Sequence, residues 1–296
     1  MSLPGRFVST AAGRVFVHRS GQGAPLVLLH GWMMSHWYFR PLIDGLGGAR
    51  EIIAIDLPGF GESDRPSPSA FAYDLSAFAD VVDGVLQSLD LDSADVIGHS
   101  MGGGTAMTLA ARHPERVQRL VLVAPAVYPL PLLPWQARLG LTAVVGPLLF
   151  KHVYSRRDFA RGCREWSVRQ GRLLDDDWID YFWARLNRAG GRESTYACLR
   201  MLTSLAAHNA DPGRVRAPTL IVWGDEDRLV PLAHGRRLQR AVAGARLEIV
   251  PASGHTPFLE RPAEFLRLLT PFLAAPASPL LATPIPPRRA HSVVTS

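Results

Sequence analysis

Six short apolar runs, separated by segments with helical periodicity, limit most strongly how this chain can fold. They are residues 24–31, 51–59, 94–100, 117–125, 217–225 and 245–255. Most change abruptly from apolar residues to glycine, proline or polar residues, as in APLVLLHG and EIIAIDLPG. Uninterrupted apolar runs of this length are typical of strands buried on both faces of a parallel sheet.

Helical patterns lie between these runs. Residues 73–90 place Leu75, Phe78 and Val82 on one stripe of a helix. Further helices are predicted over residues 101–112, 233–242 and 262–274. Two short strands within residues 6–18 suit an edge hairpin. The alternation predicts an α/β fold: a mostly parallel sheet with helices on both faces.

The alternation breaks between residues 129 and 213. This stretch has few strand-like runs and contains four of the seven tryptophans: Trp135, Trp166, Trp178 and Trp183. We interpret it as a helical cap inserted over one end of the sheet. The core is then residues 1–128 and 214–274, the cap is 129–213, and the proline-rich tail 275–296 is expected to be disordered.

Composition and charge exclude several classes of protein. The chain has 32 basic and 26 acidic residues, a net charge of +6, with 47% hydrophobic residues. Its arginines are interleaved with acids, as in RRDFARGCREW, so no nucleic-acid partner is expected. No leader peptide or uninterrupted membrane span is evident, so a cytoplasmic location without stable membrane insertion is expected. Cys163 and Cys198 lack metal-ligand spacing and are expected to be free thiols.

The segment GHSMG, residues 98–102, places one serine between glycines after a predicted strand and before a predicted helix. A nucleophilic serine at such a turn has a strained backbone, with strand and helix passing close on either side. Side chains at Gly98 and Gly102 would collide there. Ser100 is therefore the candidate nucleophile.

A serine hydroxyl needs a base to take its proton and a carboxylate to orient that base. His255 directly follows the last predicted strand, in SGHTPFLERP. The loop WGDEDRLVP offers three acids, Asp225, Glu226 and Asp227. Loops that follow parallel strands meet at one edge of the sheet, where Ser100 also lies. The spacing alone leaves the choice among the three acids open.

A tetrahedral intermediate also needs donors for its negative oxygen. The N–H of Met101, directly after the nucleophile, is one candidate. A second donor is expected from the loop that follows LVLLHG, where His30 is expected to make a structural hydrogen bond.

Together these segments resemble the α/β-hydrolase superfamily, over residues 15–128 and 213–274. The resemblance implies the chain order Ser–acid–His, the acid Asp227, and the N–H of Trp32 as second oxyanion donor. The helical cap of that superfamily corresponds to the predicted insertion, residues 129–213. The segments that carry it are LLHGWMMSHWYF, IDLPGFGESDRP, VIGHSMGGGTAM, LIVWGDEDRLVP and SGHTPFLERPAEF.

The identity of the nucleophile, a serine, limits the range of reactions that the resemblance implies. Similar epoxide hydrolases and haloalkane dehalogenases use an aspartate where this chain has Ser100. The favoured expectation is a carboxylic-ester or thioester hydrolase that forms an acyl-enzyme on Ser100, without a metal or cofactor. The alternatives are a C–C bond hydrolase of the vinylogous diketone type, a cofactor-free perhydrolase, and a small-molecule binding protein on the same fold.

Side chains near the expected site suggest an apolar pocket for a small to medium acyl or aromatic substrate. His99 adjoins Ser100, but the sharp turn should point its ring away, so that it packs or hydrogen-bonds nearby. No sequence feature specifies an oligomeric state. The candidate lining residues are Trp32, Met33, His99, Val127 and Tyr128.

Overall fold

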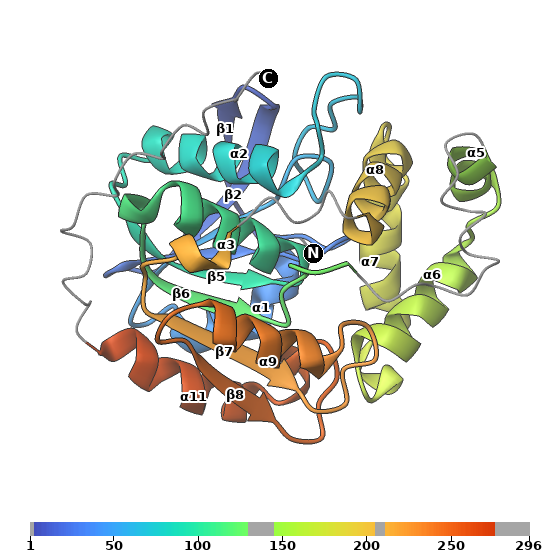
Figure 1. Cartoon of the computed structure of the whole chain (residues 1–296). Coiled ribbons are helices and arrows are strands. Elements are labelled where there is room, and N and C mark those ends of the chain that lie inside the picture. Colours follow the sequence, from blue (N-terminus) through green and yellow to red (C-terminus); the bar gives the residue numbers. More distant parts are fainter. Residues whose placement is uncertain (1–2, 130–144, 205–210, 276–296) are drawn as a thin grey trace, which may run out of the picture.

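One eight-stranded sheet forms the centre of the protein (Figure 1). The structure, a computed structural model, describes residues 3–129, 145–204 and 211–275. The strand order is β1-β2-β4-β3-β5-β6-β7-β8. The strands are β1 Arg6–Thr10, β2 Gly13–Ser20, β3 Pro25–Leu29, β4 Glu51–Ile55, β5 Ala94–His99, β6 Val117–Val123, β7 Thr219–Gly224 and β8 Arg246–Val250.

The pairing confirms the predicted α/β fold. All neighbours from β4 to β8 are parallel, whereas β1 pairs with β2, and β2 with β4, in antiparallel register. The predicted hairpin is present at one edge, and its second strand continues to Ser20. Every residue of β5 and β7 is buried, which explains why these runs lack polar alternation.

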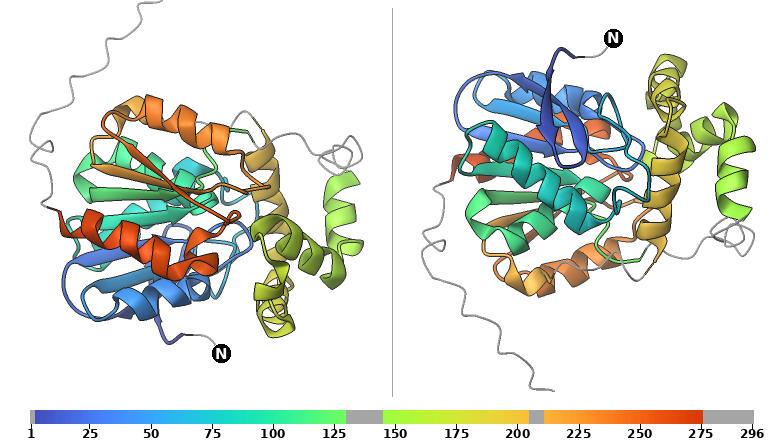
Figure 2. Two further views of the ribbon diagram at one scale, coloured as in Figure 1. Left: turned by 90° about the horizontal axis from the view of Figure 1, so that it is seen from below. Right: turned by 90° about the horizontal axis from the view of Figure 1, so that it is seen from above.

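Helices cover both faces of the sheet (Figure 2). Apolar side chains of α2, α3 and α9 pack on one face, and those of α1 and α11 on the other. The helices of the core are α1 Arg40–Leu46, α2 Leu75–Ser88, α3 Met101–Arg112, α9 Leu232–Ala241, α10 Pro257–Glu260 and α11 Pro262–Ala274. Four of them match predicted helices within a few residues. The sequence did not predict α1 and α10, because seven and four residues are too short to show a helical period.

Among the residues that the structure describes between β6 and β7, four α-helices lie beyond the carboxyl ends of the parallel strands (Figure 1). They are α5 Val145–His152, α6 Arg156–Gly162, α7 Asp176–Leu186 and α8 Gly191–Thr203, with a π-helical turn, Cys163–Ser167, after α6. The helical character of residues 145–204 agrees with the predicted insertion. Residues 130–144 and 205–210, and the predicted tail from 276 onward, lie outside the described residues, and the division into core and cap stays a prediction.

Both cysteines are buried and free, as expected. Within the described ranges, no helix is both long and apolar enough to cross a bilayer. The same ranges contain no cluster of three or more histidine, cysteine or acidic side chains arranged to hold a metal ion.

Candidate active site

The chain turns sharply at Ser100, between β5 and α3. Ser100 has φ 52° and ψ −117°, a conformation that residues with a side chain rarely adopt. Its N–H donates to Val123 O at 2.9 Å, and its carbonyl oxygen accepts from the N–H groups of Gly104 and Ala126. These three bonds hold the strained residue at the carboxyl edge of the sheet.

Two glycines leave the space that this turn needs. A Cβ on Gly98 would lie 2.3 Å from Gly102 O, and a Cβ on Gly102 would lie 2.1 Å from Leu29 O. Both distances are far below a van der Waals contact, and the opposing atoms belong to the backbone. The steric requirement predicted at Gly98 and Gly102 is therefore confirmed.

Asp227 and His255 lie together although they follow different strands, β7 and β8. Nδ1 of His255 is 2.8 Å from Oδ2 of Asp227, and both side chains are buried. Because a carboxylate only accepts, Nδ1 carries the proton. The other carboxylate oxygen accepts the N–H groups of Leu229 and Val230, each at 2.9 Å. The aspartate that orients His255 is thus itself fixed by the backbone of its own loop.

The other two acids of this loop point elsewhere. Asp225 is exposed, and its Oδ1 accepts the N–H of Ser253 at 3.3 Å. Glu226 makes an ion pair with Arg169 at 2.6 Å. Of the three acids that the spacing left open, the structure brings Asp227 to His255.

Nε2 of His255 is buried and has no hydrogen-bond partner among the described residues. With the proton on Nδ1, this nitrogen has a lone pair that can accept a proton. His99, directly before Ser100, lies beside the base, with ring centroids 4.7 Å apart. No bond joins Ser100 to His255 within the described ranges, and such bonds often tighten only when substrate binds.

His99 supports the backbone of His255. Its Nε2–H donates to His255 O at 3.0 Å. Burial, and next the neighbouring His255, hold the pKa of His99 well below its ordinary value, so the ring is neutral at pH 7. The expected hydrogen bond of His99 near the site is present, while its contact with substrate stays a prediction.

The loop after β3 passes beside the nucleophile. A Cβ on Gly31 would lie 3.3 Å from the Cβ of Ser100. Trp32 follows Gly31, and its indole N–H donates to Thr195 O of α8 at 2.9 Å. Met101 begins α3, where N–H groups have no partner inside the helix. The backbone amides proposed for the oxyanion therefore come from two chain segments that lie beside Ser100.

His30 shapes this loop, as the sequence suggested. Its Nδ1–H donates to Gly31 O at 2.8 Å, and its Nε2 accepts the N–H of Leu57 at 3.0 Å. Both bonds require the neutral ring, and burial lowers the pKa of His30. His30 therefore joins the ends of β3 and β4.

The remaining candidate lining residues differ in surroundings. Met33 has φ 63° and lies in the turn after β3. Val127 and Tyr128 are buried, and the Tyr128 ring packs against His234 and Arg237 of α9. A surface hollow of about 590 Å³ lies elsewhere, between the β1–β2 turn and residues 62–66, and none of the three candidate catalytic side chains lines it.

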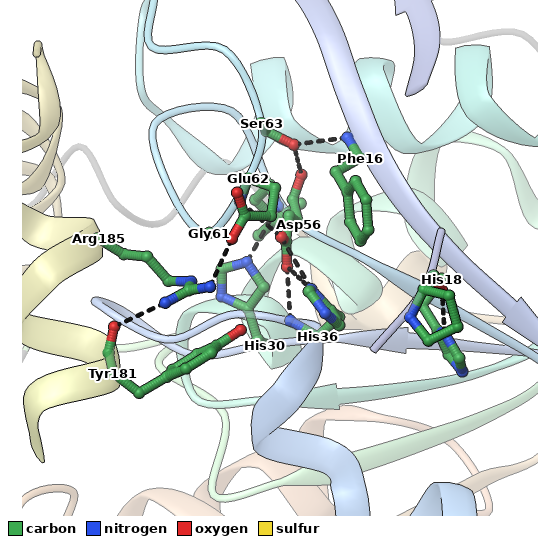
Figure 3. Close-up of polar contacts among 12 residues, drawn as sticks. Phe16, His18, His30, His36, Asp56, Gly61, Glu62, Ser63, Tyr181 and Arg185 are labelled. Carbon is green, nitrogen blue, oxygen red and sulfur yellow. Dashed lines mark hydrogen bonds and ion pairs between the residues drawn. The ribbon is translucent and has the colours of Figure 1, made fainter. Parts of the chain in front are cut away.

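A buried pair of side chains, Asp56 and His36, was not predicted (Figure 3). Asp56 accepts the N–H of His36 at 2.5 Å, its ring Nδ1–H at 2.9 Å, and the N–H of Glu62 at 2.8 Å. Burial opposes ionisation, but His36 holds the pKa of Asp56 below its usual range. The available signal was an aspartate directly after a buried strand, in IDLPG.

Glu62 connects this pair to the inserted helices. Its carboxylate makes ion pairs with Arg185 of α7, at 2.6 Å, and with Arg188, two residues after α7 ends. Arg185 also lies over the ring of Tyr181 (Figure 3). The loop after β4 is thus one of the places where the core holds the insertion.

The comparisons with known proteins agree with this architecture. Residues 24–262 match the family model described as the alpha/beta hydrolase fold. A match of this extent shows the family, so the chain belongs to the α/β-hydrolase fold family, and the predicted resemblance is confirmed.

Particular relatives and solved structures are similar to this chain over most of its length. The chain is 33% identical over 284 residues to 2-hydroxymuconate semialdehyde hydrolase of Pseudomonas sp. (strain CF600), covering 91% of this chain and 94% of the relative. It is 31% identical over 257 residues to pimeloyl-[acyl-carrier protein] methyl ester esterase of Neisseria meningitidis, covering 83% and 92%. Among solved structures, the meta-cleavage product hydrolase CumD of Pseudomonas fluorescens IP01 superimposes with a TM-score of 0.77 at 27% identity, covering 91% and 97%.

Proposed function

We propose that this hydrolase cleaves a carbon–carbon bond in a 2-hydroxy-6-oxo-2,4-dienoate, using Ser100, His255 and Asp227. The observation that carries the proposal is the free, buried Nε2 of His255 beside the strained serine turn. Relatives named as hydrolases of such dienoates support this substrate class. They favour the carbon–carbon reaction over the ester reaction that the sequence alone ranked first.

The side chains have distinct roles in this proposal. Asp227 keeps the proton of His255 on Nδ1, which leaves Nε2 to take the proton of the Ser100 hydroxyl. Asp227 also stabilises the imidazolium that results. The N–H groups of Trp32 and Met101 donate to the oxygen that becomes negative when Ser100 attacks. Water, this chain's side chains and its backbone amides suffice for every step.

The first step of this reaction is a tautomerisation of the substrate. A proton moves from the 2-hydroxyl to C5 of the substrate, which yields a 2-oxo compound. Ser100 Oγ attacks the C6 carbonyl, and the C5–C6 bond then breaks. Its electron pair moves through C4=C3 to the 2-oxo oxygen, and His255 returns its proton to the departing dienol. Water, activated by His255, releases the acyl group from Ser100 as a carboxylic acid.

Ester hydrolysis is the second candidate. The same attack on an ester carbonyl expels an alcohol in place of the dienol. One relative named as a methyl ester esterase is 31% identical, close to the identity of the dienoate hydrolases. For this reaction the substrate would be the small to medium apolar acyl or aromatic ester that the sequence suggested.

A pair of substrates tests the choice. The wild type and Ser100→Ala are compared on 2-hydroxy-6-oxo-6-phenylhexa-2,4-dienoate, followed by loss of its visible absorbance, and on p-nitrophenyl butyrate. We expect the wild type to cleave the dienoate with the higher kcat/KM, and Ser100→Ala to cleave neither. Steady turnover of p-nitrophenyl butyrate without dienoate cleavage would establish the ester reaction. Turnover of neither, with no labelling of Ser100 by a fluorophosphonate, would favour a binding protein.

A further inference from the structure

A short segment of the insertion, Ser167–Arg169, lies against the loop that carries His255. Thr256, directly after His255, is fully buried. Its Oγ1–H donates to Ser167 O at 2.8 Å, and the same oxygen accepts the hydroxyl of Tyr38 at 2.7 Å. Tyr38 belongs to a short 3-10 helix, His36–Phe39, that follows β3. The Thr256 side chain therefore joins this helix, the loop of His255 and the insertion.

Glu260 makes a second connection between the same two segments. Its Oε1 accepts the N–H of Gly254 at 2.8 Å, and its Oε2 accepts the N–H of Arg169 at 2.7 Å. Gly254 directly precedes His255. Hydrogen bonds to an ionised acceptor are about twice as strong as neutral ones. One carboxylate therefore holds both the backbone before the base and the backbone of the insertion.

The acid loop is tied to the same segment. The Arg169 guanidinium contacts Glu226, directly before Asp227, and the Glu226 N–H donates to Ser253 O at 2.9 Å. A Cβ on Gly254 would lie 2.8 Å from Arg169 N, so the insertion fits closely against this turn. The Arg169–Glu226 pair is more than one third exposed and contributes little to stability. The pair matters for geometry, because it connects the loops of Asp227 and His255 to the one segment Ser167–Arg169.

We propose that Ser167–Arg169 forms a clasp, and that Thr256 and Glu260 are positioning residues through which the insertion sets the imidazole of His255 against Asp227 and Ser100. The inference deepens the proposed function and rests on it. A base displaced by about 1 Å can slow catalysis by about 10²-fold. Because the clasp touches neither Ser100 nor the oxyanion amides, its loss should act on kcat while leaving KM nearly unchanged.

Glu260→Gln tests the clasp, with Glu62→Gln as its matched control. Both substitutions turn a carboxylate that links core and insertion into an amide, but Glu62 contacts Arg185 and Arg188, far along the chain from both triad loops. Thr256→Val removes the hydroxyl relay while keeping the shape. Circular dichroism and Tm establish that each variant is folded, and Glu260→Asp tests rescue by a shorter carboxylate.

Two measurements are needed. The first is the downfield proton resonance of His255 Nδ1–H, assigned by its loss in His255→Gln, which requires no substrate. We expect it to broaden through faster solvent exchange in Glu260→Gln and Thr256→Val, and to be unchanged in Glu62→Gln. The second is turnover of the dienoate and of p-nitrophenyl butyrate, in which we expect kcat to fall by about 10–100-fold in the clasp variants.

The outcomes separate the clasp from the proposed function. An unchanged resonance in Glu260→Gln, together with a kcat equal to that of Glu62→Gln, would overturn the clasp. If Thr256→Val does not fold, the result for Glu260→Gln alone decides whether the clasp positions His255. If the wild type cleaves neither substrate, the proposed function fails, and the resonance still shows whether the insertion positions His255.

Discussion

The nucleophile turn and the acid–base loops reach the same edge of the sheet by different means. Residues 98–102 are consecutive, and backbone contacts with β3 and β6 fix their turn. Asp227 and His255 are 28 residues apart and depend on a side-chain hydrogen bond. The loop of His255 is also held by Tyr38 and by the clasp, 218 and 89 residues from Thr256 along the chain.

The comparison shows that two different kinds of interaction position the two parts of the candidate site. Steric exclusion around glycine sets the nucleophile turn, so the core alone can form it. Hydrogen bonds between distant segments set the base, so its position depends on how the insertion is seated. Substitutions in the first region should therefore affect folding, and those in the second should affect alignment.

Removing the nucleophile should separate chemistry from folding most completely. For Ser100→Ala we expect kcat to fall by about 10⁶-fold, as for nucleophiles of other triads. Tm should stay near that of the wild type, because alanine keeps the same strained backbone. Steady-state turnover assays measure kcat, and calorimetry measures Tm. Substantial residual turnover would place the nucleophile at another residue.

Substitution of Asp227 should give the next largest loss of activity. Asp227→Asn should keep the fold but lower kcat by about 10⁴-fold, because the amide favours the wrong tautomer of His255. Asp225→Asn, two residues away and exposed, is the control and should change kcat little. Steady-state kinetics on either substrate compare the pair. Equal losses in both variants would contradict the assignment of Asp227.

Glycine substitutions test whether sterics govern the first region. Gly102→Ala should destabilise the protein by about 4 kcal/mol or more, because its Cβ meets backbone atoms of β3. In Gly84→Ala, on α2, the Cβ meets no atom within 4 Å, and we expect stabilisation by about 1 kcal/mol. Urea denaturation compares both variants. Similar stabilities would show that the turn is less tight than its geometry indicates.

Lowering the pH should give the smallest effect, a gradual loss of folding stability. Burial lowers the pKa of His30 and His99, so the unfolded chain binds protons that the folded chain does not as pH falls below 6.5. Stability should therefore decrease in that range, by at most about 1.4 kcal/mol per pH unit for each group. Urea denaturation between about pH 5.5 and 7 measures the slope. His99→Asn should reduce it by one group's share, and a flat profile would contradict neutral burial.

Much of the fold was predictable from particular residues. The six apolar runs located β3 to β8, and the hairpin pattern located β1 and β2. Asp74, which caps α2 by accepting the N–H of Ala77, stands near the predicted start of that helix. The Asp56–His36 pair and the clasp were not predictable. Their partners lie in separate loops with no periodic pattern, and polar residues in loops are common for many reasons.

The sequence by itself determined the alternation of strands and helices, the glycine-lined turn at Ser100 and, with the family resemblance, the order of the three candidate catalytic residues. These features depend on side-chain periodicity and on contacts between near neighbours, which the order of residues dictates directly. Residue spacing left three acids open and the family resemblance implied Asp227, but only the tertiary structure shows Asp227 in contact with His255. Only the tertiary structure, too, shows that Ser167–Arg169 lies against the loop of His255. Such hydrogen bonds require segments far apart in the chain to approach within about 3 Å, and that distance is set by how all the layers pack together.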